Sequence, residues 1–360
     1  MFRESIKKMA AYTPGEQPRP GQRLIKLNTN ENPYPPSPKV RQAVAKAASA
    51  TLRLYPAPRA DEFVTAASKL YKIPVDMIVA GNGSDELLAM VFRATLSPGD
   101  CVVYPVPTYS LYDTLAEVQE AKVIRLPLKP GFEMPMDELA RCRANLTIVC
   151  NPNSPSGTLT PLKSLDRLAR SLRGRMLVID EAYVDFANET ALPLLKRNRN
   201  VVILRSLSKS FSLAGMRLGL CFAHQEVIEG LMKVKDSYNL SRIALAGGAA
   251  ALSDAAWMRR NVERVRKTRI ATEARLRKLG FEVPESSANF VLARMVGRDM
   301  SPIASGLRRA GILVRYFATP LLRDALRISI GTPAEMAALF AALKPLLLKL
   351  APEHRNGSRG

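Results

Sequence analysis

The sequence predicts an α/β protein whose large domain is a mainly parallel sheet flanked by helices. Between about residues 76 and 230, short apolar runs alternate with longer helical patterns, which is typical of successive βα units. After about residue 241 the pattern changes to helices with a few short strands, which indicates a smaller α+β domain. The polar residues of most interest fall where apolar runs end, and ligands bind at those ends in such sheets.

Seven apolar runs are the predicted strands of the large sheet. Each has four to six residues, as expected for strands buried inside a sheet. Helical patterns follow several of them, at 84–95, 162–172 and 225–235. The predicted strands span 77–80, 101–104, 122–126, 146–150, 176–179, 201–204 and 218–223.

The whole chain divides into four predicted segments. Residues 1–38 are rich in Pro and Asn, which indicates an arm wrapped over the rest of the protein. We expect the large domain at 39–240, the small domain at 241–350 and a polar tail at 351–360. The small domain should hold a long amphipathic helix after residue 241, strands at 281–283, 289–293, 312–316 and 326–330, and a closing helix at 333–350.

Composition favours an ordinary globular protein. The chain has 360 residues, 47% of them hydrophobic, which suffices for one large domain and a smaller companion. No apolar run approaches the roughly 18 to 20 residues that cross a bilayer. The charged opening, residues 1–10, lacks the apolar segment and cleavage site of a secretory signal. We therefore expect a cytoplasmic protein with no membrane partner.

The cysteines and histidines argue against disulfides and metal sites. The four cysteines lie far apart and mostly within or beside apolar runs, so we expect reduced, buried thiols. His224 and His354 have no ligand partner at a useful spacing, which argues against a metal site and a histidine-based triad. The cysteines are Cys101, Cys142, Cys150 and Cys221.

The formal net charge of +21 would suit a nucleic acid or an anionic membrane surface. The basic residues are nevertheless dispersed and mixed with acids. In 257–279, for example, arginines and glutamates share helical spacing, which favours a solvated helix face. We expect no nucleic-acid partner.

A lysine motif follows the run 201–204. Lys209 lies among the hydroxyls of Ser206 and Ser208, and Arg217 comes eight positions later. An amine can form an imine with an aldehyde, and the hydroxyls and the guanidinium can bind an anion. The motif therefore fits a cofactor that carries both an aldehyde and a phosphate.

A second strand end supplies an acid and a phenol. The run 176–179 leads into Asp180 and, three residues later, Tyr183. In pyridoxal 5'-phosphate (PLP) chemistry, an amine holds the aldehyde and an acid keeps the ring nitrogen protonated. Lys209 and Asp180 together therefore indicate PLP far more strongly than either residue alone.

Three further segments support this interpretation without proving it. The loop 81–86 joins a strand to a helix, and its glycines and helix N-terminus suit a phosphate, although many helices begin in this way. Tyr109 could stack on a flat ring or only pack at a turn. The segment 150–157 could place donors beside a ring oxygen or form only a tight turn.

Taken together, these motifs resemble the class I/II aminotransferases of PLP fold type I and, among them, the histidinol-phosphate aminotransferase group. The resemblance extends over nearly the whole chain and implies a fold-type I PLP-dependent transferase. The segments that carry it are Asn28 to Pro35, Leu54 to Pro56, Gly83 to Glu86, the turn at 151–157, Asp180 to Tyr183, the motif at 206–217 and Leu326 to Ser329.

The resemblance implies a role for each site residue. Lys209 would bond to the cofactor aldehyde and shuttle a proton, and Asp180 would pair with the ring nitrogen. Tyr183 would donate to the ring 3'-oxygen, and Tyr109 would stack on the ring. The phosphate would be held by the amides of Ser84 and Asp85, the hydroxyls of Ser206 and Ser208, and the guanidinium of Arg217.

One position departs from the family pattern. The family often has asparagine directly before the proline of the Asn-Pro turn, where it contacts the ring oxygen. This chain has Ser154 there and Asn153 one place earlier. Either side chain could supply the donor, or the oxygen could lose one donor.

The resemblance also implies how substrates bind. Arg327 would grip an α-carboxylate through two hydrogen bonds, and Arg315 matches the position that contacts a substrate phosphate. Asn30 belongs to the opening substrate-binding motif, and Tyr55 would reach into the site of a second subunit. We therefore expect a homodimer with shared active sites.

The activity implied is transamination between histidinol phosphate and 2-oxoglutarate, as in histidine biosynthesis. Within the same fold, an aminotransferase for aromatic amino acids or a threonine-phosphate decarboxylase are alternatives. A PLP-sensing DNA-binding regulator would suit the basic charge. Such regulators carry an added winged-helix module, however, and only about 30 residues precede the first family motif.

Overall fold

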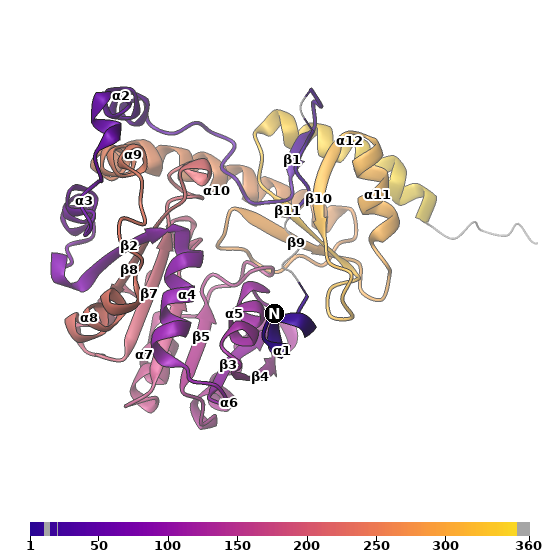
Figure 1. Cartoon of the computed structure of the whole chain (residues 1–360). Coiled ribbons are helices and arrows are strands. Elements are labelled where there is room, and N and C mark those ends of the chain that lie inside the picture. The colour runs from indigo at the N-terminus through magenta and orange to yellow at the C-terminus, as the bar shows by residue number, and fades with distance from the viewer. Residues whose placement is uncertain (11–14, 20, 351–360) are drawn as a thin grey trace, which may run out of the picture.

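The computed structural model describes residues 1–10, 15–19 and 21–350. The predicted tail at 351–360, which includes His354, lies outside the described residues. The α/β class is confirmed, because a large sheet is flanked by helices and a smaller sheet lies beside it (Figure 1).

The large sheet has the seven predicted strands in the order β2-β8-β7-β6-β5-β3-β4. Strand β8 is antiparallel to both of its neighbours, and the other pairs are parallel, so the sheet is mainly parallel as predicted. The strands are β2 (Ile78–Asn82), β3 (Cys101–Val106), β4 (Lys122–Pro127), β5 (Leu146–Cys150), β6 (Met176–Asp180), β7 (Val201–Ser206) and β8 (Leu218–Ala223).

The central strands read as continuous apolar runs because both faces of the sheet are covered. In β7, Val201 and Ile203 enter one hydrophobic core, and Val202 and Leu204 enter the other. The helices are α1 (Glu4–Lys8), α2 (Pro38–Ala47), α3 (Asp61–Tyr71), α4 (Gly83–Thr95), α5 (Leu111–Val118), α6 (Met136–Arg141), α7 (Leu162–Ser171), α8 (Gln225–Val234), α9 (Arg242–Ser253), α10 (Ala255–Lys278), α11 (Ser301–Arg309) and α12 (Pro333–Leu350).

The small sheet has four strands in the order β1-β10-β11-β9: β1 (Ile25–Leu27), β9 (Phe290–Arg294), β10 (Ile312–Tyr316) and β11 (Ala325–Ser329). Strand β1 lies in the segment predicted to be an arm, and it pairs in parallel with β10. Three residues are too few to show a period, so only this pairing reveals the strand. In Figure 1 the small sheet, with α11 and α12, lies to the right of the large sheet.

Two predictions for the small domain were wrong in detail. The segment 281–283 is not a strand, since it makes only the isolated bridge between Glu282 and Arg294. Pro284 follows at once and has no N–H with which to extend a ladder. The long helix after residue 241 is two helices, α9 and α10, separated at Asp254, whose backbone leaves the helical region at φ −117° and ψ 42°.

Helix α9 packs against α2 and α3. We retain the four predicted segments, with boundaries at 38, 240 and 350, as our proposal for the domain organisation.

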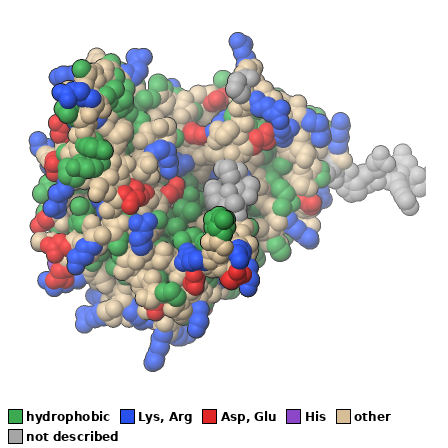
Figure 2. Space-filling view, in the orientation of Figure 1, with side chains coloured by type: hydrophobic (Ala, Val, Ile, Leu, Met, Phe, Trp, Pro, Cys, Tyr) green, Lys and Arg blue, Asp and Glu red, His purple; other side chains and the backbone are tan. Residues whose placement is uncertain are grey.

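Figure 2 shows lysine and arginine side chains spread over both parts of this face and interspersed with acids. In the described part of the chain, no helix combines the length and apolar character needed to cross a membrane.

Candidate active site

The predicted catalytic residues meet at one edge of the large sheet. Asp180 is the last residue of β6, and it lies opposite Leu204 of the parallel neighbour β7. Lys209 follows the end of β7. Strand β2 runs in the same direction as β7, because both are antiparallel to β8 between them. The N-terminus of α4, which follows β2, therefore reaches the same edge.

The Asp180 carboxylate is buried and held by two donors. Its Oδ1 accepts a hydrogen bond from the Ala182 amide at 3.1 Å, and its Oδ2 accepts one from the Tyr112 hydroxyl at 2.8 Å. Burial raises the pKa of Asp180 to about 6, and the Tyr112 hydrogen bond opposes that rise. Tyr112 was missed by the sequence analysis, although it lies three residues after Tyr109 and its ring packs edge-on against that of Tyr109.

Tyr183 is held by the opening arm. Its hydroxyl accepts a hydrogen bond from Asn30 Nδ2 at 3.1 Å, and Asn30 Oδ1 accepts one from the Ser329 hydroxyl at 2.8 Å. Asn30 is almost fully buried and has a positive φ of 58°. Because the Tyr183 oxygen accepts this bond from Asn30, the Tyr183 hydroxyl can donate its proton to another acceptor. The arm, the large sheet and the small sheet therefore meet at this phenol.

The Lys209 amine lies close to the opening arm and to Tyr183. Its Nζ donates to the Thr29 carbonyl at 3.0 Å and lies 5.9 Å from the Tyr183 ring centroid. Burial, and next the positive charge of Arg327, lower the pKa of Lys209 to about 8. A substantial fraction of the amine is thus neutral near physiological pH, as a nucleophile requires.

The start of α4 and the Arg217 side chain form a cradle for an anion. A Cβ added to Gly219 would lie 2.5 Å from the Gly83 carbonyl carbon and 2.6 Å from the Ser84 amide nitrogen. Only glycine at 219 therefore lets β8 run so close to the first turn of α4. Arg217 has a positive φ of 51°, a conformation that a non-glycine residue adopts at some cost.

The other predicted phosphate residues surround Arg217. Its guanidinium donates to the Ser208 hydroxyl at 3.3 Å and to Asp85 Oδ2 at 3.0 Å. The Ser206 hydroxyl accepts from the Ser208 amide at 3.2 Å. Tyr109 joins this group, because its hydroxyl donates to Asp85 Oδ1 at 3.2 Å. Contacts among these side chains thus assemble the predicted cradle.

The turn at 151–157 places its two candidate donors differently. Asn153 Nδ2 donates to the Pro107 carbonyl at 3.2 Å and to the Ser156 hydroxyl at 2.9 Å, so its amide ties the turn to the neighbouring loop. The Ser154 hydroxyl instead accepts from Arg327 Nη1 at 3.2 Å. Asn153 therefore shapes the turn, and Ser154 contacts the predicted substrate-binding arginine.

Two arginines lie directly opposite each other on the small sheet. Arg315 of β10 and Arg327 of β11 are register partners, and both guanidinium groups lie near the Phe317 ring, at 5.3 and 5.6 Å from its centroid. Arg327 Nη2 also donates to the Asn28 carbonyl at 2.9 Å. Like charges opposite each other on adjacent strands repel, so a bound anion would relieve the repulsion.

A buried ion network lies behind the catalytic residues. Arg205 pairs with Glu181 at 3.0 Å and with Asp185 at 3.2 Å, and the Ser210 hydroxyl donates to Asp185. Glu181 directly follows Asp180, and Ser210 directly follows Lys209. The network therefore ties the end of β6 to the lysine loop.

Tyr55 does not join the other predicted residues within this chain. Its side chain is 77% exposed, and its ring stacks on Tyr238 with 4.5 Å between centroids. Leu52 and Leu54, its neighbours in the sequence, are also exposed, as is its stacking partner Tyr238. The predicted role of Tyr55 thus depends on a second subunit.

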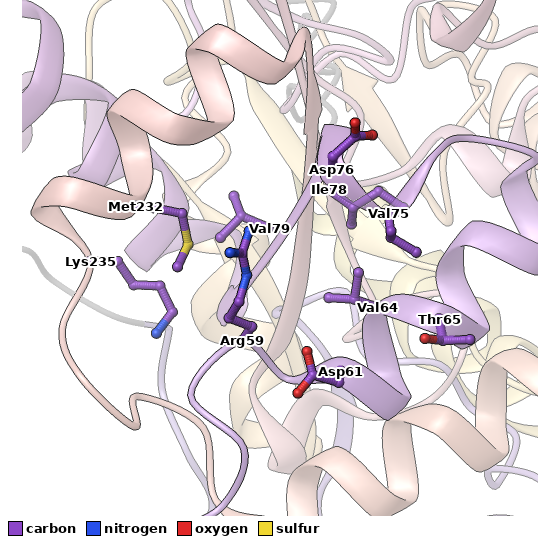
Figure 3. A pocket seen from close by; sticks show the side chains of 10 residues that line it. All are labelled: Arg59, Asp61, Val64, Thr65, Val75, Asp76, Ile78, Val79, Met232 and Lys235. Atoms are coloured by element: carbon purple, nitrogen blue, oxygen red, sulfur yellow. The ribbon is translucent and has the colours of Figure 1, made fainter.

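A separate cavity of about 200 Å³ lies at the opposite end of β2 (Figure 3). Its walls include Ile78 and Val79, at the start of the strand whose other end leads into α4. No residue of the site described above lines this cavity.

The residues at the sheet edge fit PLP. The cradle made possible by Gly219 matches a phosphate, Lys209 an aldehyde, Asp180 a protonated ring nitrogen and Tyr183 a ring oxygen. The profile described as aminotransferase class I and II matches residues 22–343. This chain belongs to the class I and II aminotransferases.

Similar proteins within this family are histidinol-phosphate aminotransferases. The chain is 44% identical to histidinol-phosphate aminotransferase 1 of Trichormus variabilis over 96% of this chain and 99% of that protein. It is 46% identical to the enzyme of Citrifermentans bemidjiense over 96% and 98% of the two chains. The Sinorhizobium meliloti enzyme, solved in complex with PLP, has a TM-score of 0.88 at 25% identity and covers 97% of this chain and 98% of its own.

Proposed function

We propose that this aminotransferase uses PLP to interconvert histidinol phosphate and 2-oxoglutarate with imidazole-acetol phosphate and glutamate, in cytoplasmic histidine biosynthesis. The observation that carries the proposal is the 44–46% identity, over nearly the full length of both chains, to enzymes named for this activity. The family alone would leave the substrate open, because one fold supports many activities.

When bound, PLP would supply an electron sink next to the substrate Cα. Lys209 supplies the amine that holds the cofactor and, when free, takes the proton from Cα; its pKa of about 8 suits both tasks. Asp180 would hold the ring nitrogen in its protonated form. Tyr183 would donate its proton to the ring oxygen, because its hydroxyl oxygen already accepts a hydrogen bond from Asn30.

The cofactor phosphate would bind at the start of α4. The amides of Ser84 and Asp85 are donors at a helix N-terminus, where the helix dipole favours an anion. The guanidinium of Arg217 and the hydroxyls of Ser206 and Ser208 complete the cradle. Charge-assisted hydrogen bonds of this kind keep the cofactor in place while Lys209 is free. Tyr109 would stack on the ring.

The contacts of the turn at 151–157 favour one interpretation of the departure from the family pattern. Because the Asn153 amide is occupied with Pro107 and Ser156, we infer that it orders the turn. Ser154 orients Arg327. Tyr183 is then the principal donor to the ring oxygen.

The arginine pair on β10 and β11 suits two unlike substrates. Both 2-oxoglutarate and histidinol phosphate carry forked anionic oxygens that a guanidinium binds through paired hydrogen bonds. Arg327 would hold the α-carboxylate of the amino acid partner, and Arg315, directly opposite it, the substrate phosphate. Asn30 borders this substrate side through Ser329 of β11.

We also propose a homodimer in which Tyr55 completes the partner's site. Its 77% exposure and the exposed apolar side chains of Leu52 and Leu54 support this proposal, because such a group invites burial in an interface. The test is complementation between inactive variants. A mixture of Tyr55→Ala and Lys209→Ala, unfolded and refolded together, should regain activity, because each heterodimer holds one intact site. A mixture that stays inactive although heterodimers form would contradict the shared site.

Kinetics test the substrate. The ratio kcat/KM should be at least about tenfold higher for histidinol phosphate than for phenylalanine or tyrosine, because only the phosphate uses Arg315. Comparable values would contradict the assignment. Release of carbon dioxide from threonine phosphate without a keto acid would indicate the decarboxylase instead, and DNA binding at low salt would indicate the regulator.

A further inference from the structure

Tyr112 contacts the catalytic carboxylate from α5, which follows β3, whereas the lysine motif follows β7. It lies on α5, is fully buried, and donates its hydroxyl proton to Asp180 Oδ2 at 2.8 Å. The other carboxylate oxygen accepts from the Ala182 amide at 3.1 Å. Each oxygen of Asp180 thus has one donor from the protein, and the orientation of the carboxylate is set before any ligand binds.

We propose that Tyr112 is a positioning residue for transamination, whose hydroxyl orients Asp180 and keeps it ionised so that the cofactor ring nitrogen retains its proton. The proposal rests on the proposed function only in requiring that the chain binds PLP. It assigns Tyr112 no contact with cofactor or substrate. Tyr112 acts through Asp180.

The charges around Asp180 explain why such a donor is needed. Burial raises the pKa of Asp180, and the nearby carboxylates of Asp85 and Glu181 raise it further. The register partner of Asp180 on β5 is Cys150, a buried thiol that offers no positive charge. The hydrogen bonds from Tyr112 and from Ala182 are the groups that lower the pKa of Asp180.

Tyr112 can fill this role because it is both rigid and neutral. Its ring packs edge-on against Tyr104, at 5.5 Å between centroids, and against Tyr109, at 5.7 Å. Burial raises the pKa of Tyr112 well above its ordinary value, so the hydroxyl remains a donor. One turn of chain therefore supplies both the expected ring-stacking residue, Tyr109, and the residue that holds the acid.

Tyr104 provides a matched control within the same cluster. It is also fully buried, and its hydroxyl donates to a carboxylate, that of Asp113, at 2.6 Å. Asp113 pairs with Arg125 and takes no part in the active site. The variants Tyr112→Phe and Tyr104→Phe each remove one buried hydroxyl that binds an aspartate, but only the first affects Asp180.

The experiment measures PLP affinity of the cofactor-free protein and the pH titration of the absorbance of the bound cofactor. Tyr112→Phe should weaken PLP binding about tenfold or more, as expected for a lost hydrogen bond to a charged group. The midpoint of the absorbance titration should also shift to higher pH. The positive charge of a protonated ring nitrogen opposes protonation at the Lys209 nitrogen, and this opposition is lost when the ring nitrogen loses its proton. Tyr104→Phe should change neither. Equal results for the two variants would overturn the proposal.

A double-mutant comparison separates positioning from general destabilisation. In an Asp180→Asn background, adding Tyr112→Phe should leave PLP affinity within about twofold, because the interaction is already lost. A further loss there would show that Tyr112 acts independently of Asp180. This background also serves if Tyr112→Phe alone does not fold, since it leaves no buried carboxylate short of a donor. Failure of the wild type to bind PLP would instead refute the proposed function.

Discussion

Replacing Asp180 by asparagine should make the cofactor-free protein more stable while weakening its hold on PLP. The wild-type carboxylate is almost fully buried and, without PLP, faces no positive partner among the groups that shift its pKa. Asparagine keeps the size and one carbonyl oxygen of the side chain but carries no charge. The substitution therefore removes the cost of burying a charge.

The pKa of Asp180 determines the size of this stability difference and its dependence on pH. A carboxyl whose pKa rises from its ordinary 3.8 to about 6 on folding loses about 3 kcal/mol of folding free energy once it is ionised. Because the folded pKa is the higher one, nothing is lost below about pH 4. The loss accumulates as pH rises from about 4 to 6 and is complete above that. The variant should thus be more stable than the wild type by about 3 kcal/mol near pH 8 and by about half that near pH 5.

Urea unfolding of both cofactor-free proteins, at equal protein concentration and at these two pH values, measures the difference. The same substitution at the exposed Asp76 serves as the control and should change stability by less than about 0.5 kcal/mol. PLP affinity of Asp180→Asn should fall at the same time. A variant that is less stable than the wild type near pH 8, or equally affected at both pH values, would refute the reasoning.

Three further predictions concern the lysine, the cradle and the arginine pair. The rate at which the cofactor-free protein captures PLP should rise with pH to a midpoint near 8, since burial lowers the pKa of Lys209 to about 8; a midpoint near that of an exposed lysine would contradict this. Gly219→Ala should weaken PLP binding about tenfold or more, because its Cβ would lie 2.6 Å from the Ser84 amide nitrogen. The control Gly230→Ala, which has open space around its Cβ, should leave PLP binding unchanged. Calorimetric titration of both variants with PLP measures the difference. Arg315→Leu should raise the KM for histidinol phosphate about tenfold and that for 2-oxoglutarate less; equal increases in steady-state assays would argue against a phosphate-specific role.

The catalytic strand ends were predictable because their signals are local. The runs 176–179 and 201–204, which became the greater part of β6 and β7, are apolar, as is typical of strands buried on both faces. Asp180 stands out because it directly follows such a run, and Lys209 because it lies among serines just beyond the end of the next one, where a buried charge is costly without a purpose. The phosphate cradle could also be predicted, because glycine, serine and arginine near the ends of helices and strands are residue types that bind anions.

Contacts between distant segments were not predictable in this way. Tyr112 and Asp180 are 68 residues apart, and nothing in either segment names the other as its partner. Arg315 and Arg327 face each other only because of the register between β10 and β11. Strand β1 exists because β10 offers it an edge, and 281–283 fails as a strand because it makes a single bridge before Pro284.

The order of residues along the chain thus decided which chemical groups this protein possesses and at which strand ends they stand, because periodicity and residue type act over a few positions. Tertiary packing decided which of these groups touch, how deeply each is buried and hence the proton affinities of Asp180 and Lys209. Those properties depend on the dielectric surroundings and on partners supplied by distant segments, and neither is encoded in any short stretch of sequence.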